Sequence, residues 1–175
     1  MIIVGSVILF SAGVFDEPVS NVVINQAPQE HFHNGADMSE LAQINSLREQ
    51  IEANPNDYHK MLELAHLLND SGFYEEAIKW YDKYLGSHNN DADVYVDRGV
   101  CYYQLNQLDK AIDSMEKGIK INPQHQTAHF NLGVVNLAKN NIDAAISWWQ
   151  KAIELNPNTD IANKSRELIQ KNTNN

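Results

Sequence analysis

Apolar residues recur with helical spacing through the middle of the chain, and small residues recur there with a much longer period. Two positions of the pattern hold only alanine or glycine at intervals of 34 residues: Ala65, Gly99 and Gly133 at one, and Ala77, Ala111 and Ala145 at the other. A fixed period of this length over about 100 residues is typical of helical units stacked side by side. The pattern therefore predicts an all-α solenoid rather than a single closed globule.

Each unit of the pattern divides into two helical halves. Gly72, Asn106 and Asn140 separate the halves, and glycine and asparagine most readily adopt the left-handed conformation that ends a helix. The predicted first halves are 58–70, 92–104 and 126–138, and the second halves are 74–85, 108–121 and 142–155. Because the connecting loops are short, each pair should form an antiparallel hairpin. The small residues should then face one another and let the two backbones approach closely.

Two further helices are predicted beside the three units, which occupy residues 57–158. Ser39 can act as the N-cap of a helix that ends before Pro55, since the residue before a proline disfavours the helical region. Residues 39–56 are therefore predicted to be a lone packing helix, the second half of an incomplete unit. Residues 159–171 are predicted to form a capping helix over the apolar face of the third unit.

This pattern resembles the tetratricopeptide repeat (TPR) family over about residues 58–157. The resemblance rests on the period, the paired small residues, the helix-ending residues and the prolines that close units. It implies a right-handed α-solenoid of antiparallel helix hairpins. The chain departs from the family at Tyr84, where alanine is usual, and at Arg98, where leucine is usual.

The N-terminal segment, residues 1–15, is apolar apart from two serines. As a helix it would span about 22 Å, less than the roughly 30 Å hydrocarbon core of a bilayer. Three interpretations stay open: a membrane anchor that lacks its first residues, a signal peptide, and a buried element of a soluble fold. An anchor or signal is favoured because Asp16 and Glu17 follow at once and the first basic residue is Arg48. The repeats are then expected to be periplasmic, with a cytoplasmic location as the alternative, and residues 16–38 to be a linker.

The charge balance excludes some classes of partner. The chain of 175 residues has 13 Lys and Arg against 23 Asp and Glu, a formal net charge of −10. No basic cluster is available to neutralise phosphates, which argues against nucleic acid as the main partner. The single cysteine, Cys101, cannot form an internal disulfide, and we expect it to be a buried structural thiol.

The TPR resemblance also implies a concave groove along the first helix of each unit, in which a peptide segment of a partner binds. The residues expected to line the groove are His59, Leu62, His66, Asn69, Val96, Val100, Tyr103, Phe130, Asn131, Val134 and Leu137. The second and third units contribute mainly apolar side chains, and exposed apolar surface of this kind usually marks an interaction. The alternatives are that the linker or a neighbouring copy of the chain covers the groove.

Chaperone-binding members of the family hold a C-terminal carboxylate with Lys, Arg and Asn at set groove positions. The corresponding residues in this chain are Leu62, His66, Asp97, Thr127 and Asn131. None is a lysine or arginine that could pair with a carboxylate, which argues against an Hsp70/Hsp90 co-chaperone. Asn131 is expected to hydrogen-bond the backbone of a bound peptide.

Histidines are common metal ligands, and the sequence offers two pairs of them. His125 and His129 are four residues apart, but the predicted helix begins between them. His59 and His66 are about 10 Å apart along a helix axis, too far to share one ion directly. We therefore predict no metal site, no cofactor and no catalytic residue.

The predicted function is a non-catalytic scaffold that binds a peptide segment of a partner protein, tethered to a membrane and facing outward. The chain resembles bacterial membrane-anchored TPR proteins, including those that serve cytochrome c maturation, so the resemblance implies a role in assembling a protein complex. A different class of function is self-assembly, in which the groove binds a neighbouring copy. A third is a histidine-based metal-handling protein.

Overall fold

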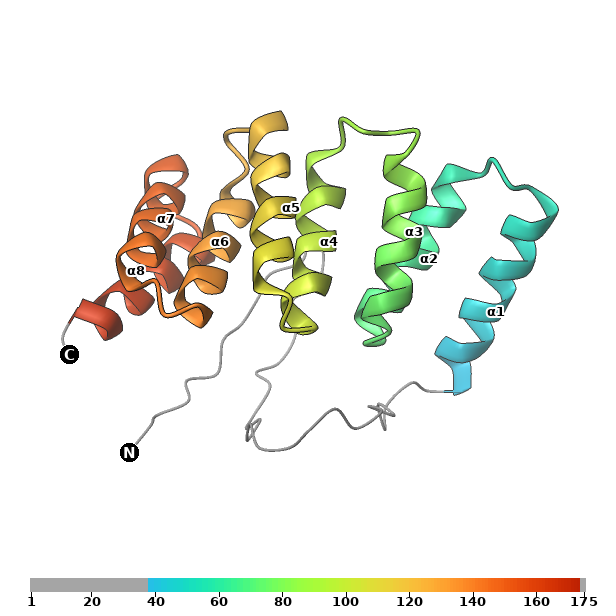
Figure 1. Ribbon diagram of the computed structural model, residues 1–175, viewed down its shortest axis with the longest axis horizontal. Helices are drawn as coiled ribbons and strands as arrows, with labels where there is room; N and C mark the ends of the chain where they lie inside the picture. The colour runs from blue at the N-terminus through green and yellow to red at the C-terminus, as the bar shows by residue number, and fades with distance from the viewer. Residues whose placement is uncertain (1–37, 174–175) are drawn as a thin grey trace.

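The computed structural model describes residues 38–173, which fold into α-helices joined by short loops (Figure 1). The helices are α1 (Met38–Ala53), α2 (Tyr58–Asp70), α3 (Tyr74–Leu85), α4 (Ala92–Gln104), α5 (Leu108–Ile121), α6 (Gln126–Ala138), α7 (Ile142–Leu155) and α8 (Asp160–Thr173). The predicted anchor or signal segment, residues 1–15, and nearly all of the predicted linker lie outside the described residues. Within 38–173, no helix combines the length and the apolar character needed to cross a membrane.

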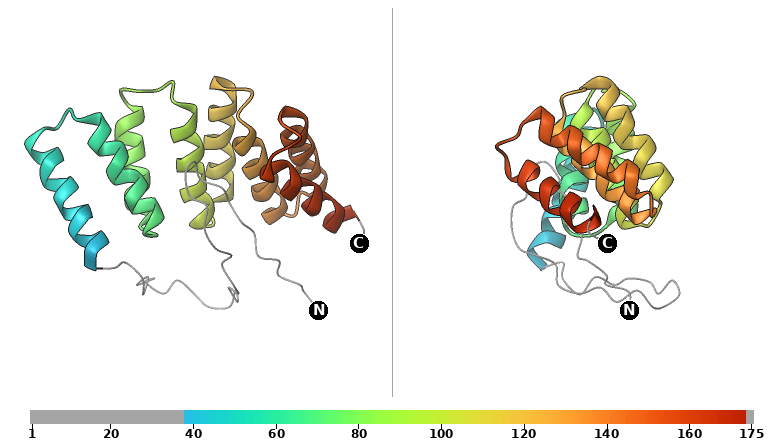
Figure 2. Two further views of the ribbon diagram at one scale, coloured as in Figure 1. Left: turned by 180° about the vertical axis from the view of Figure 1, so that it is seen from behind. Right: turned by 90° about the vertical axis from the view of Figure 1, so that its left-hand side faces the viewer.

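The helices stack in series, with α1 at one end of the array and α8 at the other (Figure 2). Helices α2 and α3 pack together as unit 1, α4 and α5 as unit 2, and α6 and α7 as unit 3. Helix α1 packs on α2, and α8 packs mainly on α7 and also touches α6. The prediction of an all-α solenoid of helix hairpins is confirmed.

The helix limits agree with the repeat pattern. All six helices of units 1 to 3 begin and end where the sequence predicts. At the N-terminal end the prediction was wrong in one detail, because α1 includes Met38 and Ser39 therefore lies inside the helix rather than at its N-cap. At the other end Thr159 is the N-cap of α8, where its Oγ1 accepts a hydrogen bond from the Ala162 N–H at 3.1 Å.

The residues between the two helices of each unit adopt the left-handed conformation that the sequence predicts. The φ angle is 81° at Gly72, 56° at Asn106 and 61° at Asn140. Glycine and asparagine tolerate this region better than other residues, so they let the chain reverse within a few residues. These turns set each hairpin at the same position of the 34-residue period.

The small residues lie where the two helices of a hairpin are closest. A Cβ placed on Gly99 would lie 2.6 Å from Met115 Cγ and 3.1 Å from the Ala111 carbonyl oxygen. A Cβ placed on Gly133 would lie 2.3 Å from Nε1 of the Trp149 indole. A larger residue at either glycine would therefore separate the helices, which is the packing reason for a glycine inside a helix.

The two departures from the family pattern both make polar contacts near the junction of units 1 and 2. The Tyr84 ring stacks on His88 with 4.5 Å between centroids, and its hydroxyl lies 3.0 Å from Asp91 Oδ2. Arg98 lies between helices α3 and α5, where Nη1 pairs with Asp82 at 2.5 Å and Nε donates to Ser114 Oγ at 3.1 Å. A tyrosine and an arginine replace smaller or apolar residues here without leaving the arginine charge unpaired.

Candidate functional site

The predicted groove residues lie on α2, α4 and α6, the first helices of the three units. The structure brings residues of neighbouring first helices into contact. His66 Nε2 on α2 lies 3.2 Å from Asp97 Oδ2 on α4, and Tyr103 on α4 packs against the hydrophobic cluster of Phe130 and Val134 on α6. These contacts join α2 to α4 and α4 to α6. That the face of these three helices binds a peptide stays a prediction.

Most of the apolar residues predicted for the groove are buried, whereas Tyr103 and Leu137 are half-buried. Val96 and Val100 are 1% and 5% exposed, and Phe130, Asn131 and Val134 have no exposed surface. Phe130 and Val134 share a hydrophobic cluster with the indole of Trp149, and side chains of α8 pack against that cluster: Ile161, Leu168 and Ile169. A peptide could contact Phe130 or Val134 only if the covering side chains moved.

The part of the face on α2 is more open. His59 is exposed, and Leu62 and His66 are half-buried. Asn69, one turn further along, is 8% exposed, and its Oδ1 accepts a hydrogen bond from the Cys101 thiol at 3.2 Å. Accessible groups of the predicted groove are thus concentrated in unit 1 and at its junction with unit 2.

Below this open surface lies a group of polar side chains from α2, α3 and α4, here called the polar cluster: His66, Asn69, Tyr81, Asp97 and Cys101. The rings of His66 and Tyr81 are 5.7 Å apart between centroids. Asp97 is 3% exposed and Tyr81 is fully buried. Within residues 38–173, Asp97 Oδ1 and the Tyr81 hydroxyl have no hydrogen-bond partner. Buried polar atoms without partners are uncommon in proteins and require a specific explanation.

The charges of the polar cluster shift the pKa values of its members. The hydrogen bond with Asp97 raises the pKa of His66 above 6.5, and the carboxylates of Asp97, Asp70 and Asp91 add to this effect while burial opposes it. Burial raises the pKa of Asp70, and the charges of Asp97 and Glu40 raise it further. The region therefore contains more negative than positive charge whenever His66 is neutral.

Burial also determines the state of the two weak acids in the cluster. The pKa values of the Cys101 thiol and the Tyr81 phenol are both raised, first by burial and then by the nearby Asp97 carboxylate. Cys101 is fully buried, as the sequence predicts for a structural thiol. A thiol held in its neutral form is a poor nucleophile, so the geometry does not favour covalent chemistry at Cys101.

The other histidine pair performs structural roles. His125 is the N-cap of α6, where its Nδ1 accepts from the Ala128 N–H at 3.3 Å. Its Nε2 lies 2.8 Å from Asp93 Oδ1 without the alignment of a hydrogen bond. His129 is buried, which lowers its pKa, and its Nδ1 lies 3.0 Å from the His125 carbonyl oxygen. In residues 38–173 no group of three or more acidic, histidine or cysteine side chains could hold a metal ion.

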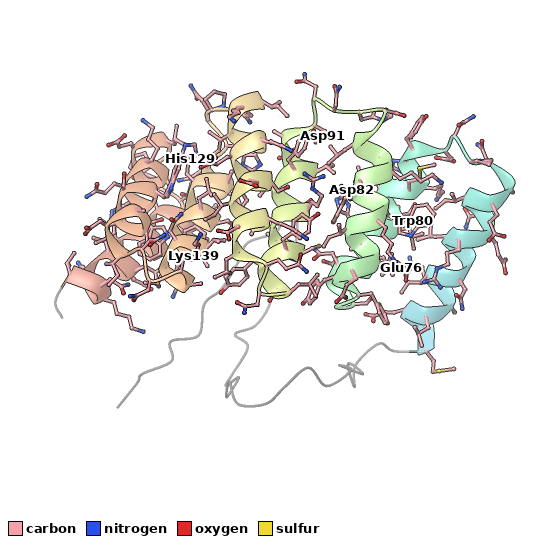
Figure 3. The ribbon with its side chains drawn as sticks, viewed as in Figure 1. Glu76, Trp80, Asp82, Asp91, His129 and Lys139 are labelled. Carbon is pink, nitrogen blue, oxygen red and sulfur yellow. The ribbon has the colours of Figure 1, made fainter. Side chains whose placement is uncertain are left out.

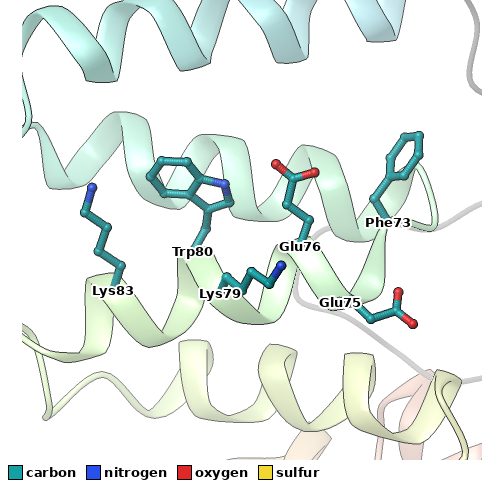
Figure 4. Close-up of a pocket in the computed structure, with 6 residues that line it drawn as sticks. All are labelled: Phe73, Glu75, Glu76, Lys79, Trp80 and Lys83. Atoms are coloured by element: carbon teal, nitrogen blue, oxygen red, sulfur yellow. The ribbon is translucent and has the colours of Figure 1, made fainter.

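A second surface feature lies on the other layer of unit 1 and was not predicted. A cavity of about 450 Å³ is lined by Phe73, Glu75, Glu76, Lys79, Trp80 and Lys83 (Figure 4). Trp80 and Glu76 lie on the side of α3 that faces α1 (Figure 3). Arg48 of α1 donates to both carboxylate oxygens of Glu76 at 2.7 and 2.8 Å, linking the two helices. The spacing of Glu76, Trp80 and Lys83 on one helix face was the available signal.

Comparison with known proteins identifies the family. Residues 61–171 match the family model described as the Cilia and flagella-associated protein 70 middle TPR-like domain. The chain belongs to this TPR-like family. A TPR relative of known sequence is the tetratricopeptide repeat domain-containing protein PYG7, chloroplastic, of Arabidopsis thaliana, which is 32% identical over 91 residues. The match covers 50% of this chain and 30% of PYG7, so the TPR chain spans less than a third of that relative's length.

Solved structures share the TPR fold at low sequence identity. MamA superposes with a TM-score of 0.66 at 20% identity, covering 77% of this chain and 87% of MamA. The type III secretion chaperone SycD of Yersinia enterocolitica, solved in complex with a peptide of the translocator YopD, has a TM-score of 0.63 at 22% identity and covers 66% of this chain and 91% of SycD. A second SycD structure, described as an alternative dimer, has a TM-score of 0.64. At these identities the likeness concerns the fold alone.

Proposed function

We propose that this chain is a non-catalytic TPR scaffold that binds a peptide segment of a partner protein along α2 and α4. The observation that carries the proposal is that neighbouring first helices are in contact while His59, Leu62 and His66 on α2 remain accessible. Leu62 supplies an apolar contact on this helix, and the exposed His59 supplies a polar group beside it. The likeness to a TPR-fold protein solved with a bound peptide supports a ligand of this kind.

The array is suited to this task because its helices are already packed before a partner arrives. A rigid surface loses little conformational freedom on binding, so more of the contact energy is retained as affinity. The apolar residues of unit 3 that the sequence assigns to the groove, such as Phe130 and Val134, are covered. We therefore place the binding surface on units 1 and 2, with the covered residues of unit 3 supporting its shape.

Site-specific photo-crosslinking in the native host tests this proposal. A photoreactive amino acid at Leu62, on the accessible face, is expected to cross-link to a partner protein. The same amino acid at Lys117, an exposed residue on α5 of the opposite layer, serves as the control. Equal cross-linking from both positions, or none from Leu62, would contradict the assignment of the binding face.

We further propose that residues 1–15 tether the protein to a membrane, with the repeats on the outer, periplasmic side, and that it assists the assembly of a protein complex such as the cytochrome c maturation machinery. The apolar composition of this segment and the acidic residues that follow it support the proposal. The full chain is expected to stay in the membrane fraction after alkaline carbonate washing. Protease added outside the inner membrane should then digest the repeats, and protection from it would contradict the orientation.

The alternative function is self-assembly, and the dimer described for one SycD structure gives it specific support. In that case the photoreactive residue at Leu62 would cross-link one copy of the chain to another. Size-exclusion chromatography at several concentrations provides a second measurement. Dimers that form with increasing concentration and are lost when residues 1–38 are removed would favour self-assembly over binding of a different protein.

A further inference from the structure

We propose that the polar cluster binds a cationic side chain, lysine or arginine, of the peptide that occupies the face of units 1 and 2. The inference rests on the proposed function and specifies the chemistry of its ligand. It reverses the arrangement of the carboxylate-binding groove, because the protein supplies the anion and the peptide supplies the cation.

The first support is the set of hydrogen-bond acceptors in the cluster. Asp97 Oδ1 and the Tyr81 hydroxyl are buried and have no hydrogen-bond partner in the described part of the chain. Asn69 Oδ1 accepts one hydrogen bond, from the Cys101 thiol, and a carbonyl oxygen can accept a second. An ammonium carries three N–H donors and a guanidinium five, and neither has an acceptor. A cation can therefore donate to the Asp97, Tyr81 and Asn69 oxygens, each of which is able to accept a hydrogen bond.

The second support is the charge around the cluster. Helix α2 contributes the carboxylate of Asp70 and the imidazole of His66, and α4 contributes Asp97, with Asp91 at its N-cap. The basic side chain nearest in sequence, Arg98, is already bonded to Asp82 and Ser114. His66 is thus the only member of the polar cluster that can carry a positive charge. A peptide cation would compensate a carboxylate that is otherwise buried with one free oxygen.

The third support is the route to the site. The side chain of His66 is 45% exposed, whereas the Asp97 side chain beside it is 5% exposed. His66 is thus the more exposed partner of the pair, and a peptide cation could reach Asp97 Oδ2 from this side only if the imidazole moved aside. A protonated His66 competes with a peptide cation for Asp97, and a neutral His66 competes less. Binding should therefore strengthen as the pH rises through the pKa of His66.

Selection of random short peptides displayed on phage against the immobilised full chain supplies the probe. We expect the selected peptides to share a lysine or arginine. Their dissociation constants are then measured by fluorescence anisotropy, together with those of matched peptides in which norleucine replaces the cationic residue. The replacement should weaken binding by about tenfold or more, because it removes the partner of a buried charge.

Protein variants locate the effect. Asp97→Asn should weaken binding of the cationic peptide by about tenfold or more and should bind the norleucine peptide as the unmodified protein does. Asp113→Asn removes the same charge from an exposed position on α5 and is the matched control, with binding unchanged. Tyr81→Phe removes one acceptor with little risk to folding and should weaken binding of the cationic peptide alone. His66→Ala should strengthen binding at about pH 6 and remove most of its pH dependence.

The outcomes separate the two proposals. Selected peptides that require neither a cation nor Asp97 or Tyr81 would overturn this inference and leave the proposed function intact. Failure to select any peptide that binds the full chain would overturn both. If Asp97→Asn unfolds, which circular dichroism would reveal, Tyr81→Phe and the norleucine peptides decide the question alone.

Discussion

The junction of units 1 and 2 and the junction of unit 3 with α8 use the same structural positions with opposite chemistry. Tyr81 of unit 1 and Trp149 of unit 3 are equivalent residues of the repeat, and both are fully buried. The Trp149 indole N–H donates to the Phe130 carbonyl oxygen at 3.2 Å, and hydrophobic side chains surround the ring. The Tyr81 hydroxyl lies in the polar cluster with Asp97 and has no hydrogen-bond partner among the residues that the structure describes.

The two ends of the array therefore differ in whether their buried polar groups have hydrogen-bond partners. The apolar end is closely packed, because the Trp149 indole N–H has a hydrogen-bond acceptor and side chains of α8 cover the ring. The junction of units 1 and 2 retains polar atoms that are not satisfied within the protein, which costs stability. A protein tolerates such a cost where binding requires it, which agrees with the binding role proposed above for the first two units.

The largest expected effect is at the apolar end. Trp149→Ala should lower the free energy of unfolding by about 3–5 kcal/mol, because it removes a fully buried ring and leaves a cavity. Trp148→Ala, which truncates the neighbouring half-buried indole, is the control and should cost less. Chemical denaturation followed by circular dichroism measures both. Equal losses of unfolding free energy in the two variants would contradict the assignment of the buried Trp149 ring as the main contributor to the stability of this end.

The two glycines that face buried side chains should respond differently to a methyl group. Gly133→Ala should cost about 1–3 kcal/mol, since the new Cβ meets the rigid Trp149 ring. Gly99→Ala should cost less, because Met115 is flexible and alanine favours a helix by about 1 kcal/mol. The melting temperatures of the two variants provide the comparison. A greater loss at Gly99 would contradict the view that the apolar end is the more tightly packed.

Removal of the Tyr81 hydroxyl, unlike the substitutions above, should not lower the free energy of unfolding. Tyr81→Phe is expected to leave the free energy of unfolding unchanged or to raise it by up to about 1 kcal/mol, because a buried group without a partner is lost. Trp149→Phe is the matched change at the equivalent position and should be destabilising, since it breaks the bond to the Phe130 carbonyl. Clear destabilisation by Tyr81→Phe in urea denaturation would mean that the hydroxyl is satisfied in the folded protein.

The smallest expected effect is a change of stability with pH. The pKa of His66 in the folded protein is raised above 6.5, mainly by its interaction with Asp97. The stabilisation from this interaction is fully present below the pKa of the unfolded chain. It is lost as the pH rises through the pKa of the folded protein. The difference in unfolding free energy between the unmodified protein and His66→Gln should therefore shrink as the pH rises. It should stay below about 1 kcal/mol, because His66 is half-exposed.

The lowered pKa of His129 has the opposite linkage and contributes stability that is lost as the pH falls. Because His129 is present in both proteins, its contribution cancels in the difference between them. A difference that is independent of pH would contradict the pairing of His66 with Asp97.

Much of the fold could be predicted because its signals are local and repeated. Asn106 and Asn140 favour the left-handed conformation whatever surrounds them, so the hairpin turns follow from residue type and period. The candidate site could be predicted only in part. The position of His66 and Asn69 in the repeat assigns both residues to the groove. Asp97 was noted only because it occupies a position where carboxylate-binding relatives have a basic or amide residue. Tyr81 was not assigned to the site, and its unpartnered hydroxyl was not predicted.

The sequence by itself determined the architecture of this protein: the helices, their order and the spacing of the small residues all follow from a 34-residue period. Only the tertiary structure decided which predicted groove residues are accessible and which are covered. Accessibility depends on α8, on the aromatic side chains and on contacts between residues far apart in the chain, such as His66 with Asp97. Such contacts form only when separate units stack, so the period that predicts each helix contains no information about the chemistry where two units meet.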